Sequence, residues 1–147
     1  MNIAIVGATG NVGRKTLEVF DKKNFKFDNL YLVASEKSAG KKISFRDKEY
    51  VVENLETYDF SKADITFFAA GGKIAEKFAE TAAKHTIVIE NSSFFRMEPD
   101  VPLIVPQVKA AEIKNMKKNI IANPNCSTAQ LVIALNHYMI YSKLKEL

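Results

Sequence analysis

Hydrophobic positions along the chain alternate between short continuous runs and stretches with helical spacing. The continuous runs predict strands over residues 3–6, 30–34, 65–68, 86–89 and 120–122. Helical spacing predicts helices over residues 12–20, 74–84, 108–116 and 127–140, and two further short runs, 43–45 and 50–52, predict a hairpin. Because strands and helices alternate, we expect an α/β domain with a doubly wound, mostly parallel sheet.

The carboxyl ends of the predicted strands carry the unusual residue clusters of the chain. In a parallel sheet with right-handed crossovers these ends lie at one edge, which is where ligands bind. The segments that follow the strand ends are 7–13, 35–41, 69–73, 91–96 and 123–126. Residues 91–106 also form a long irregular stretch broken by prolines, and loops of this length are often functional. The pattern therefore predicts a single binding edge.

The composition indicates a globular protein of about one domain. The chain has 147 residues, the length of one ordinary domain, with 47% hydrophobic and 26% charged residues. One cysteine, Cys126, excludes an internal disulfide framework, and with only two histidines we expect no metal site. The net charge of +4 comes with scattered lysines, which favours a solvated surface over a nucleic-acid patch.

Neither a leader nor a membrane segment is visible in the sequence. The start, Met1 to Val6, passes directly into the first predicted strand, and no apolar stretch approaches the roughly 18 residues that a span needs. We therefore expect a cytoplasmic protein with no membrane and no nucleic-acid partner.

A glycine loop lies between the first strand and the first helix. Gly7, Gly10 and Gly13 enclose Thr9, Asn11 and Val12. Glycine permits a tight turn and lets the backbone approach a pyrophosphate, which the helix N-terminus then faces. The spacing is G-x-x-G-x-x-G rather than the usual G-x-G-x-x-G, and a turn used only for close packing is the alternative. The position of the loop favours dinucleotide binding.

The choice of dinucleotide depends on the residues after the second strand. An acidic residue there pairs with a ribose 2′-hydroxyl, whereas cations and hydroxyls hold a 2′-phosphate. Ser35 is followed by Glu36, which favours NAD, and by Lys37, Ser38 and Lys41, which favour NADP. A solvated polar turn is the alternative. The chemistry alone leans slightly towards NADP.

Cys126 lies where the last helix is expected to begin. A thiol at a helix N-terminus is stabilised as its thiolate, which favours a nucleophile over an inert core cysteine. A thiolate nucleophile needs an acid/base partner. His85 precedes its strand and so lies at the wrong edge, and His137 lies about 16 Å along the same helix. If Cys126 is catalytic, its partner is not in this chain.

Arg96 lies at the same predicted edge and can hold a phosphate or a carboxylate with its planar guanidinium. Asn91 and the serines that follow it could donate further hydrogen bonds. The alternative is a loop stabilised by its own Asx and Ser turns.

Several segments together resemble aspartate-β-semialdehyde dehydrogenase. They are Gly7–Gly13, Lys37–Lys41, Ala70–Gly72, Asn91–Met97 with Asp100–Pro106, and Asn123–Thr128. The resemblance covers essentially the whole chain, and its most specific parts are the loop around Arg96 and the segment around Cys126. It implies a Rossmann-like fold and the NADP-dependent interconversion of aspartyl 4-phosphate and L-aspartate 4-semialdehyde in the synthesis of aspartate-family amino acids.

The resemblance also implies roles for individual residues. Cys126 would be the nucleophile that forms a thiohemiacetal and then a thioester. The cofactor-binding residues implied are Gly7, Thr9, Gly10, Asn11, Val12, Gly13, Ser35, Lys37, Ser38, Ala70 and Gly71. The small-molecule substrate and its phosphate would contact Arg96, Asn91 and Asn125, and no residue would bind a metal.

The chain departs from the family in two residues and in length. The family commonly has arginine at Lys37 and aspartate at Glu90, and its members continue for about another domain, with the acid/base histidine and most of the dimer interface. We therefore expect residues 1–147 to be a dinucleotide-binding domain that ends with the nucleophile-bearing helix and lacks the second domain. The chain alone should not turn over, whereas a full-length member would be a homodimer or homotetramer.

Two other functions stay open at this point. One is a non-catalytic nucleotide-binding or redox-sensing module, in which Cys126 is inert or senses oxidants. The other is an enzyme like N-acetyl-glutamyl-phosphate reductase, the related acyl-phosphate reductase of arginine synthesis. The segments 91–96 and 123–128 argue against this second alternative.

Overall fold

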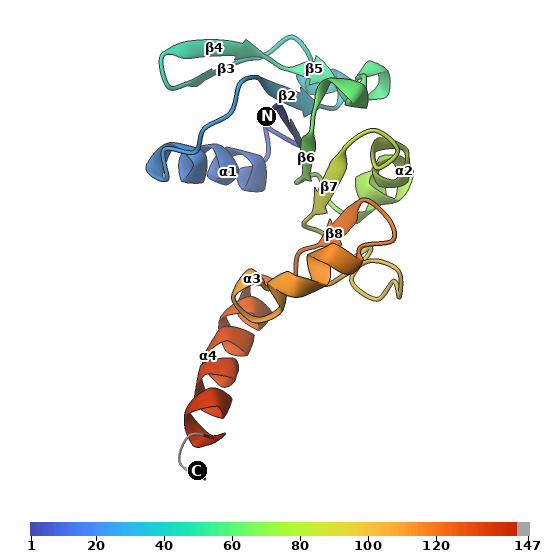
Figure 1. The fold of residues 1–147 in the computed structure, drawn as a ribbon. Helices are drawn as coiled ribbons and strands as arrows, with labels where there is room; N and C mark the ends of the chain where they lie inside the picture. Colours follow the sequence, from blue (N-terminus) through green and yellow to red (C-terminus); the bar gives the residue numbers. More distant parts are fainter. Residues whose placement is uncertain (144–147) are drawn as a thin grey trace.

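The computed structural model describes residues 1–143 and contains a six-stranded parallel sheet with the order β5-β2-β1-β6-β7-β8 (Figure 1). Its strands are β1 (Ile3–Val6), β2 (Leu30–Ala34), β5 (Glu53–Asn54), β6 (Ile65–Phe68), β7 (Ile87–Glu90) and β8 (Ile120–Ala122). An antiparallel ribbon is formed by β3 (Lys42–Phe45) and β4 (Lys48–Val51). The helices are α1 (Asn11–Lys22), α2 (Gly72–Ala82), α3 (Pro106–Lys109) and α4 (Cys126–Lys143).

The central strand β1 is buried on both faces because helices lie on either side of the sheet (Figure 1). Its residues alternate between two hydrophobic clusters, as the strand period of two requires. Ile3 and Ile5 belong to the cluster that contains Leu17 of α1. Ala4 and Val6 belong to the cluster that contains the buried alanines of α2. The loop after β1 therefore emerges between the two helices, at the carboxyl edge of the sheet.

The predicted doubly wound, Rossmann-like α/β fold is confirmed, and most elements lie within two residues of their predicted bounds. The predicted strand 86–89 lies one residue further along as β7, so Glu90 is its last residue and is fully buried. The predicted helix 108–116 is a short α-helix followed by a 3-10 helix, Ala110–Asn115, because Pro106 starts the helix earlier than the hydrophobic spacing indicates. The two-residue strand β5 was not predicted.

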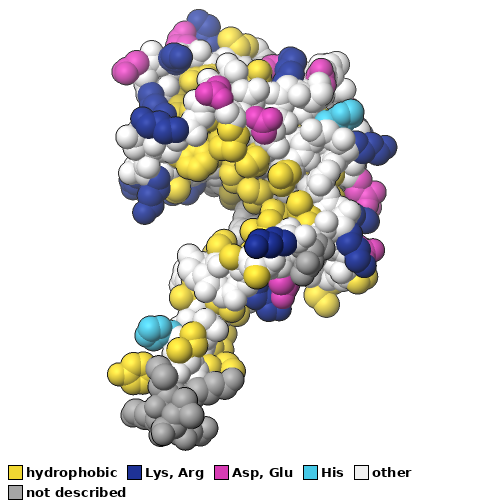
Figure 2. Space-filling model, in the orientation of Figure 1, with side chains coloured by type: hydrophobic (Ala, Val, Ile, Leu, Met, Phe, Trp, Pro, Cys, Tyr) yellow, Lys and Arg dark blue, Asp and Glu magenta, His cyan; other side chains and the backbone are white. Residues whose placement is uncertain are grey.

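The helix α4 projects away from the sheet and carries no charged residue between Cys126 and Ser142 (Figure 1). Large hydrophobic side chains are exposed all along it, namely Leu131, Ile133, Leu135, Tyr138, Met139, Ile140 and Tyr141. Figure 2 shows hydrophobic side chains gathered on the concave side of the molecule between the sheet and this helix. A helix that is apolar all round is normally buried. Of the helices within residues 1–143, none combines the length and the apolar character that a bilayer span requires.

Candidate functional site

The glycine loop turns sharply after β1. Gly7 has a φ of 84°, and a Cβ atom at this position would lie 2.8 Å from the backbone of Ala69. A Cβ at Gly13 would lie 2.4 Å from the carbonyl oxygen of Gly7. These two positions therefore require glycine, the first for its conformation and for contact with the β6 end, the second for the packing of α1 on the loop. The Gly7 and Ala8 N–H groups donate to the carbonyl of Val33, which fixes the loop to the end of β2.

The N-terminus of α1 begins with N–H groups that have no partner inside the helix. Its N-cap is Gly10, which has no side chain to accept from the first turn, and that turn contains no acidic residue. The first backbone bond into the helix runs from the Arg14 N–H to the Gly10 carbonyl at 3.0 Å, so the preceding N–H groups of Asn11, Val12 and Gly13 have no partner within the helix. Such an end is a ready anion site.

The loop after β2 touches the glycine loop. The hydroxyls of Thr9 and Ser38 lie 3.4 Å apart, the closest polar contact between the two segments. Ser35 and Lys37 are exposed beside them. Hydroxyls and an ammonium group thus gather where the sequence predicts the 2′-phosphate of a dinucleotide.

A groove of about 490 Å³ joins the remaining segments. Its lining includes Asn11 and Val12 at the start of α1, Ala69 after β6, Asn91 after β7 and Asn123 after β8. Its floor is apolar and is formed by Val19, Phe20, Phe67, Phe68 and Ile89. Ala70 and Gly71 lie just beyond Ala69, where Gly71 has a φ of 85° and precedes α2. The structure therefore brings the predicted segments together along one edge of the sheet.

Cys126 is exposed and is the first residue of α4. Asn125 caps this helix, because its side-chain oxygen accepts from the Ser127 N–H at 2.9 Å and its carbonyl accepts from the Ala129 N–H. The Cys126 Sγ lies 4.0 Å from the same Asn125 oxygen. The thiol is therefore open to solvent at a capped helix N-terminus. His137 lies on the same continuous helix, about 16 Å away along its axis.

Arg96 connects the ends of two strands. Its Nε donates to the carbonyl of Asn123 at 3.0 Å, and its Nη2 donates to the carbonyl of Asn91 at 3.2 Å. Its Nη1 has no partner within residues 1–143 and is free to bind an anion. Further along the same loop, the Lys117 ammonium beside Asp100 holds the pKa of that carboxyl below its usual range.

Sequence reasoning gave no role in the site to two polar residues of this edge, Asn123 and Glu90. Asn123 donates from its side chain to the side-chain oxygen of Asn91 at 2.6 Å. Glu90 is 0% exposed, and its Oε1 accepts from the Ser92 N–H at 2.5 Å, while its Oε2 has no partner among the described residues. A polar residue directly after a predicted strand was a signal that both positions lie at this edge, but it does not report the burial of Glu90.

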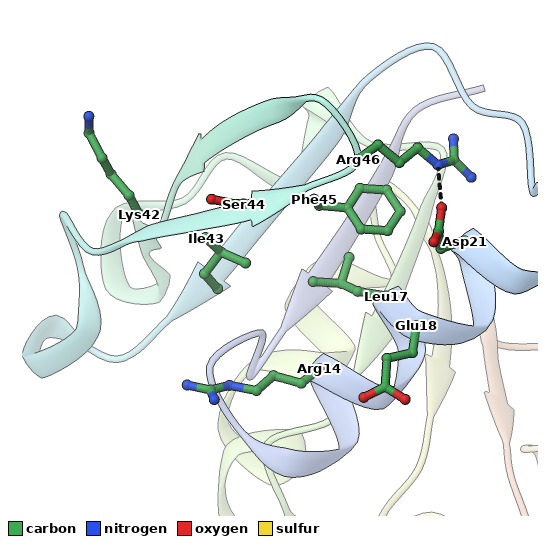
Figure 3. Close-up of a pocket in the computed structure, with 9 residues that line it drawn as sticks. All are labelled: Arg14, Leu17, Glu18, Asp21, Lys42, Ile43, Ser44, Phe45 and Arg46. Carbon is green, nitrogen blue, oxygen red and sulfur yellow. Dashed lines mark hydrogen bonds and ion pairs between the residues drawn. The ribbon is translucent and has the colours of Figure 1, made fainter.

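A second cavity, of about 460 Å³, lies apart from this edge between α1 and β3 (Figure 3). Phe45 and Leu17 face each other in it, and Arg46 reaches Asp21. Its lining contains none of the residues predicted to bind a ligand. Within the described part of the chain, no three His, Cys, Asp or Glu side chains gather in a way that could hold a metal ion.

Comparison with known proteins identifies a family that the chain resembles. Residues 2–116 match the family model described as semialdehyde dehydrogenase, NAD binding domain. Aspartate-semialdehyde dehydrogenase from Aquifex aeolicus is 51% identical over 144 residues, which is 96% of this chain and 42% of that protein. The chain thus spans less than half the length of this relative.

Solved structures of aspartate semialdehyde dehydrogenases also match the fold of this chain. The structure of aspartate semialdehyde dehydrogenase II complexed with ASA, from Vibrio cholerae, has a TM-score of 0.85 and 48% identity, and the match covers 91% of this chain and 44% of that one. The enzyme with NADP from Candida albicans has a TM-score of 0.66 and 32% identity over 91% of this chain and 45% of that one. With a dinucleotide-type glycine loop on a Rossmann-like sheet and a family model that matches most of its length, the chain belongs to the semialdehyde dehydrogenase NAD-binding domain family.

Proposed function

We propose that this chain is the dinucleotide-binding domain of an NADP-dependent aspartate-semialdehyde dehydrogenase, which interconverts L-aspartate 4-semialdehyde plus phosphate and aspartyl 4-phosphate. The observation that carries the proposal is the exposed thiol of Cys126 at a capped helix N-terminus, next to a strand end that shares one groove with the glycine loop. The relatives of highest identity described above have this activity in their names.

The residues of the glycine loop fit a dinucleotide. The space that a Cβ would fill at Gly7 and Gly13 is taken by backbone, and the uncapped start of α1 offers N–H groups to a pyrophosphate. In this proposal Gly7, Thr9, Gly10, Asn11, Val12 and Gly13 line the pyrophosphate, with Ala70 and Gly71 across the sheet edge.

The proposed cofactor is NADP rather than NAD. Lys37, Ser35 and Ser38 would hold the 2′-phosphate, and the contact between Thr9 and Ser38 ties this site to the glycine loop. A Candida albicans relative was solved with NADP, which supports the same choice. The cofactor, when bound, supplies the hydride acceptor or donor of the reaction.

Cys126 would act as the nucleophile. The N–H groups at the start of α4 favour the thiolate, and Asn125 keeps that end of the helix fixed by capping it. The thiolate would attack the aldehyde carbon to form a thiohemiacetal. Loss of a hydride, for which the bound cofactor would be the acceptor, would leave a thioester, and attack by phosphate would then release the acyl phosphate and restore the thiolate. Asn125 and Asn91 would hold substrate oxygens through side-chain amide donors that have no partner in the described part of the chain.

Arg96 would bind the phosphate. Two of its nitrogen atoms hold backbone carbonyls, so the guanidinium plane is fixed and its Nη1 edge is presented to a ligand. Neither His85 nor His137 lies where it could exchange a proton at Cys126. The acid/base group is therefore proposed to belong to the part of the longer relatives that this chain does not match, together with the contacts that make a full-length member a dimer or tetramer. The chain alone should not complete a turnover.

Alkylation of the single thiol tests this function. Cys126 should react with iodoacetamide faster than glutathione does at pH 7, and L-aspartate 4-semialdehyde should protect it better than N-acetylglutamate semialdehyde. A rate equal to that of glutathione would support a non-catalytic nucleotide-binding module instead. Preferential protection by the N-acetylglutamate compound would favour the reductase of arginine synthesis.

A further inference from the structure

Asn123 attaches the segment that carries Cys126 to the neighbouring strand β7 and to the loop that follows it. Its N–H donates to the Glu90 carbonyl at 2.7 Å, and its carbonyl accepts from the Arg96 Nε at 3.0 Å. Its side-chain Nδ2 donates to the Asn91 Oδ1 at 2.6 Å. Both its backbone groups and its side chain are therefore committed to β7 and to the loop that follows β7.

The register of the sheet explains why the two asparagines meet. In the pairing of β7 with β8, Val88 lies opposite Ile120 and Glu90 lies opposite Ala122. Asn91 and Asn123 are the next residues on the two strands, so they continue the same register at the carboxyl edge. Neighbouring strands lie about 4.8 Å apart, a separation that two short amide side chains can bridge with one hydrogen bond.

The connection from Asn123 to the thiol is short and stiff. Pro124 is buried and has a fixed φ, and Asn125 is the cap of α4. A displacement of Asn123 should therefore displace Cys126 by a similar distance. The same residue holds the Nε of Arg96, so the guanidinium and the thiol are positioned from one point.

We propose that the amide pair of Asn91 and Asn123 is a positioning device that aligns the Cys126 thiol with the free edge of the Arg96 guanidinium. Asn91 and Asn123 act through these two groups, and the device keeps an anionic reactant and the nucleophile in register. The inference rests on the proposed function of Cys126 and Arg96 and adds a role for Asn91 beyond contact with substrate.

Two alkylating probes of different charge measure the alignment. Iodoacetate carries a carboxylate that a nearby guanidinium would attract, whereas iodoacetamide is neutral, so the ratio of their rates at Cys126 reports whether a cation lies close to the thiol. In the wild-type chain this ratio should exceed the ratio for glutathione. Asn91→Ala and Asn123→Ala should each lower it by about threefold or more, within the range of electrostatic effects on association rates. The double variant should lower it no further, because either substitution alone breaks the pair.

The matched control is Met97→Ala, on the same loop. Met97 is 90% exposed, and this substitution should leave the ratio unchanged. Both asparagines lie at the surface or half-buried, so their alanine variants should fold and melt within a few degrees of wild type. A variant that fails to fold would overturn the proposal, because the pair would then stabilise the fold rather than align the site.

The remaining outcomes separate the inference from the proposed function. A wild-type ratio no higher than that of glutathione would count against the proposed pairing of Cys126 with Arg96 itself. A raised wild-type ratio that both alanine variants retain would leave the proposed function standing and refute the positioning role. Additive losses in the double variant would show that the two asparagines act separately, which also refutes it.

Discussion

Substitution of Gly13 by alanine tests the packing of the glycine loop most sharply. The added Cβ would lie 2.4 Å from the carbonyl oxygen of Gly7 and 2.7 Å from the Cα of Ala8. Both are backbone atoms, so the contact cannot be relieved by rotating a side chain. Either α1 or the loop must move by most of an ångström, and the N–H groups at the start of α1 would move with it.

The magnitude follows from two opposing effects. Forcing a methyl group into a filled space costs about 1–3 kcal/mol. Alanine in place of glycine within a helix returns about 1 kcal/mol, since Gly13 lies inside α1. We therefore expect a net loss of up to about 2 kcal/mol in the free energy of unfolding. Displacement of the loop should also weaken NADP binding by about tenfold, which corresponds to about 1.4 kcal/mol.

Urea unfolding followed by circular dichroism measures the free energy of unfolding, and isothermal titration calorimetry measures the affinity for NADP. The control for stability is Gly72→Ala at the start of α2, where a Cβ would meet only Ser92 and Phe94 at 3.8 and 3.9 Å. This control should be as stable as wild type or slightly more so. If Gly13→Ala unfolded at the wild-type urea concentration and bound NADP equally well, the close contact between loop and helix would not be what shapes this site.

Three further predictions concern other parts of the molecule. Burial, and then the nearby Glu53 carboxylate, raise the pKa of Tyr58. Above pH 10 the Tyr58 hydroxyl therefore ionises only in the unfolded chain, and its contribution to the free energy of unfolding should fall by about 1.4 kcal/mol per pH unit. Urea unfolding between pH 9 and 11 should show this fall in wild type, and Tyr58→Phe should lack the part of the fall that Tyr58 causes. Asn125→Ala should cost about 1 kcal/mol in local stability of α4, read as faster amide exchange at Ser127, whereas Asn125→Asp should keep the cap; equal exchange in all three proteins would refute the capping role. Because α4 is apolar and exposed, the chain should self-associate, and Leu135→Lys should shift its sedimentation towards the monomer; a wild-type monomer at high concentration would contradict this expectation.

The parts of the fold that depend on local pattern were predictable. The strands β1, β2, β6 and β8 coincide with their predicted bounds, because a buried parallel strand is a continuous hydrophobic run. The β3–β4 turn was predicted to be longer than it is. Arg46 adopts a φ of 52° in the tight turn and is held there by Asp21 and by the carbonyls of Phe20 and Phe25, far away in sequence. No local signal reports such support.

The candidate site likewise has features that the sequence predicted and features that it did not. The clustering of the strand ends followed from topology alone, since parallel strands share a carboxyl edge. The contacts within the cluster did not, because the pairing of Asn91 with Asn123 depends on the register of β7 against β8. The burial of Glu90 likewise depends on where β7 ends, and a charged residue gives no sequence signal for a fully buried position. Phe95 is buried in the core, whereas its neighbour Phe94 is exposed.

An amide NMR titration of the chain with NADP tests the nucleotide site at the carboxyl edge of the sheet directly. We expect saturable shifts that gather in residues 7–13, 35–38 and 70–71 and extend to Cys126, with weaker binding of NAD. Shifts that gather instead around the cavity between α1 and β3, or no shifts at millimolar NADP, would contradict a nucleotide site at the carboxyl edge of the sheet.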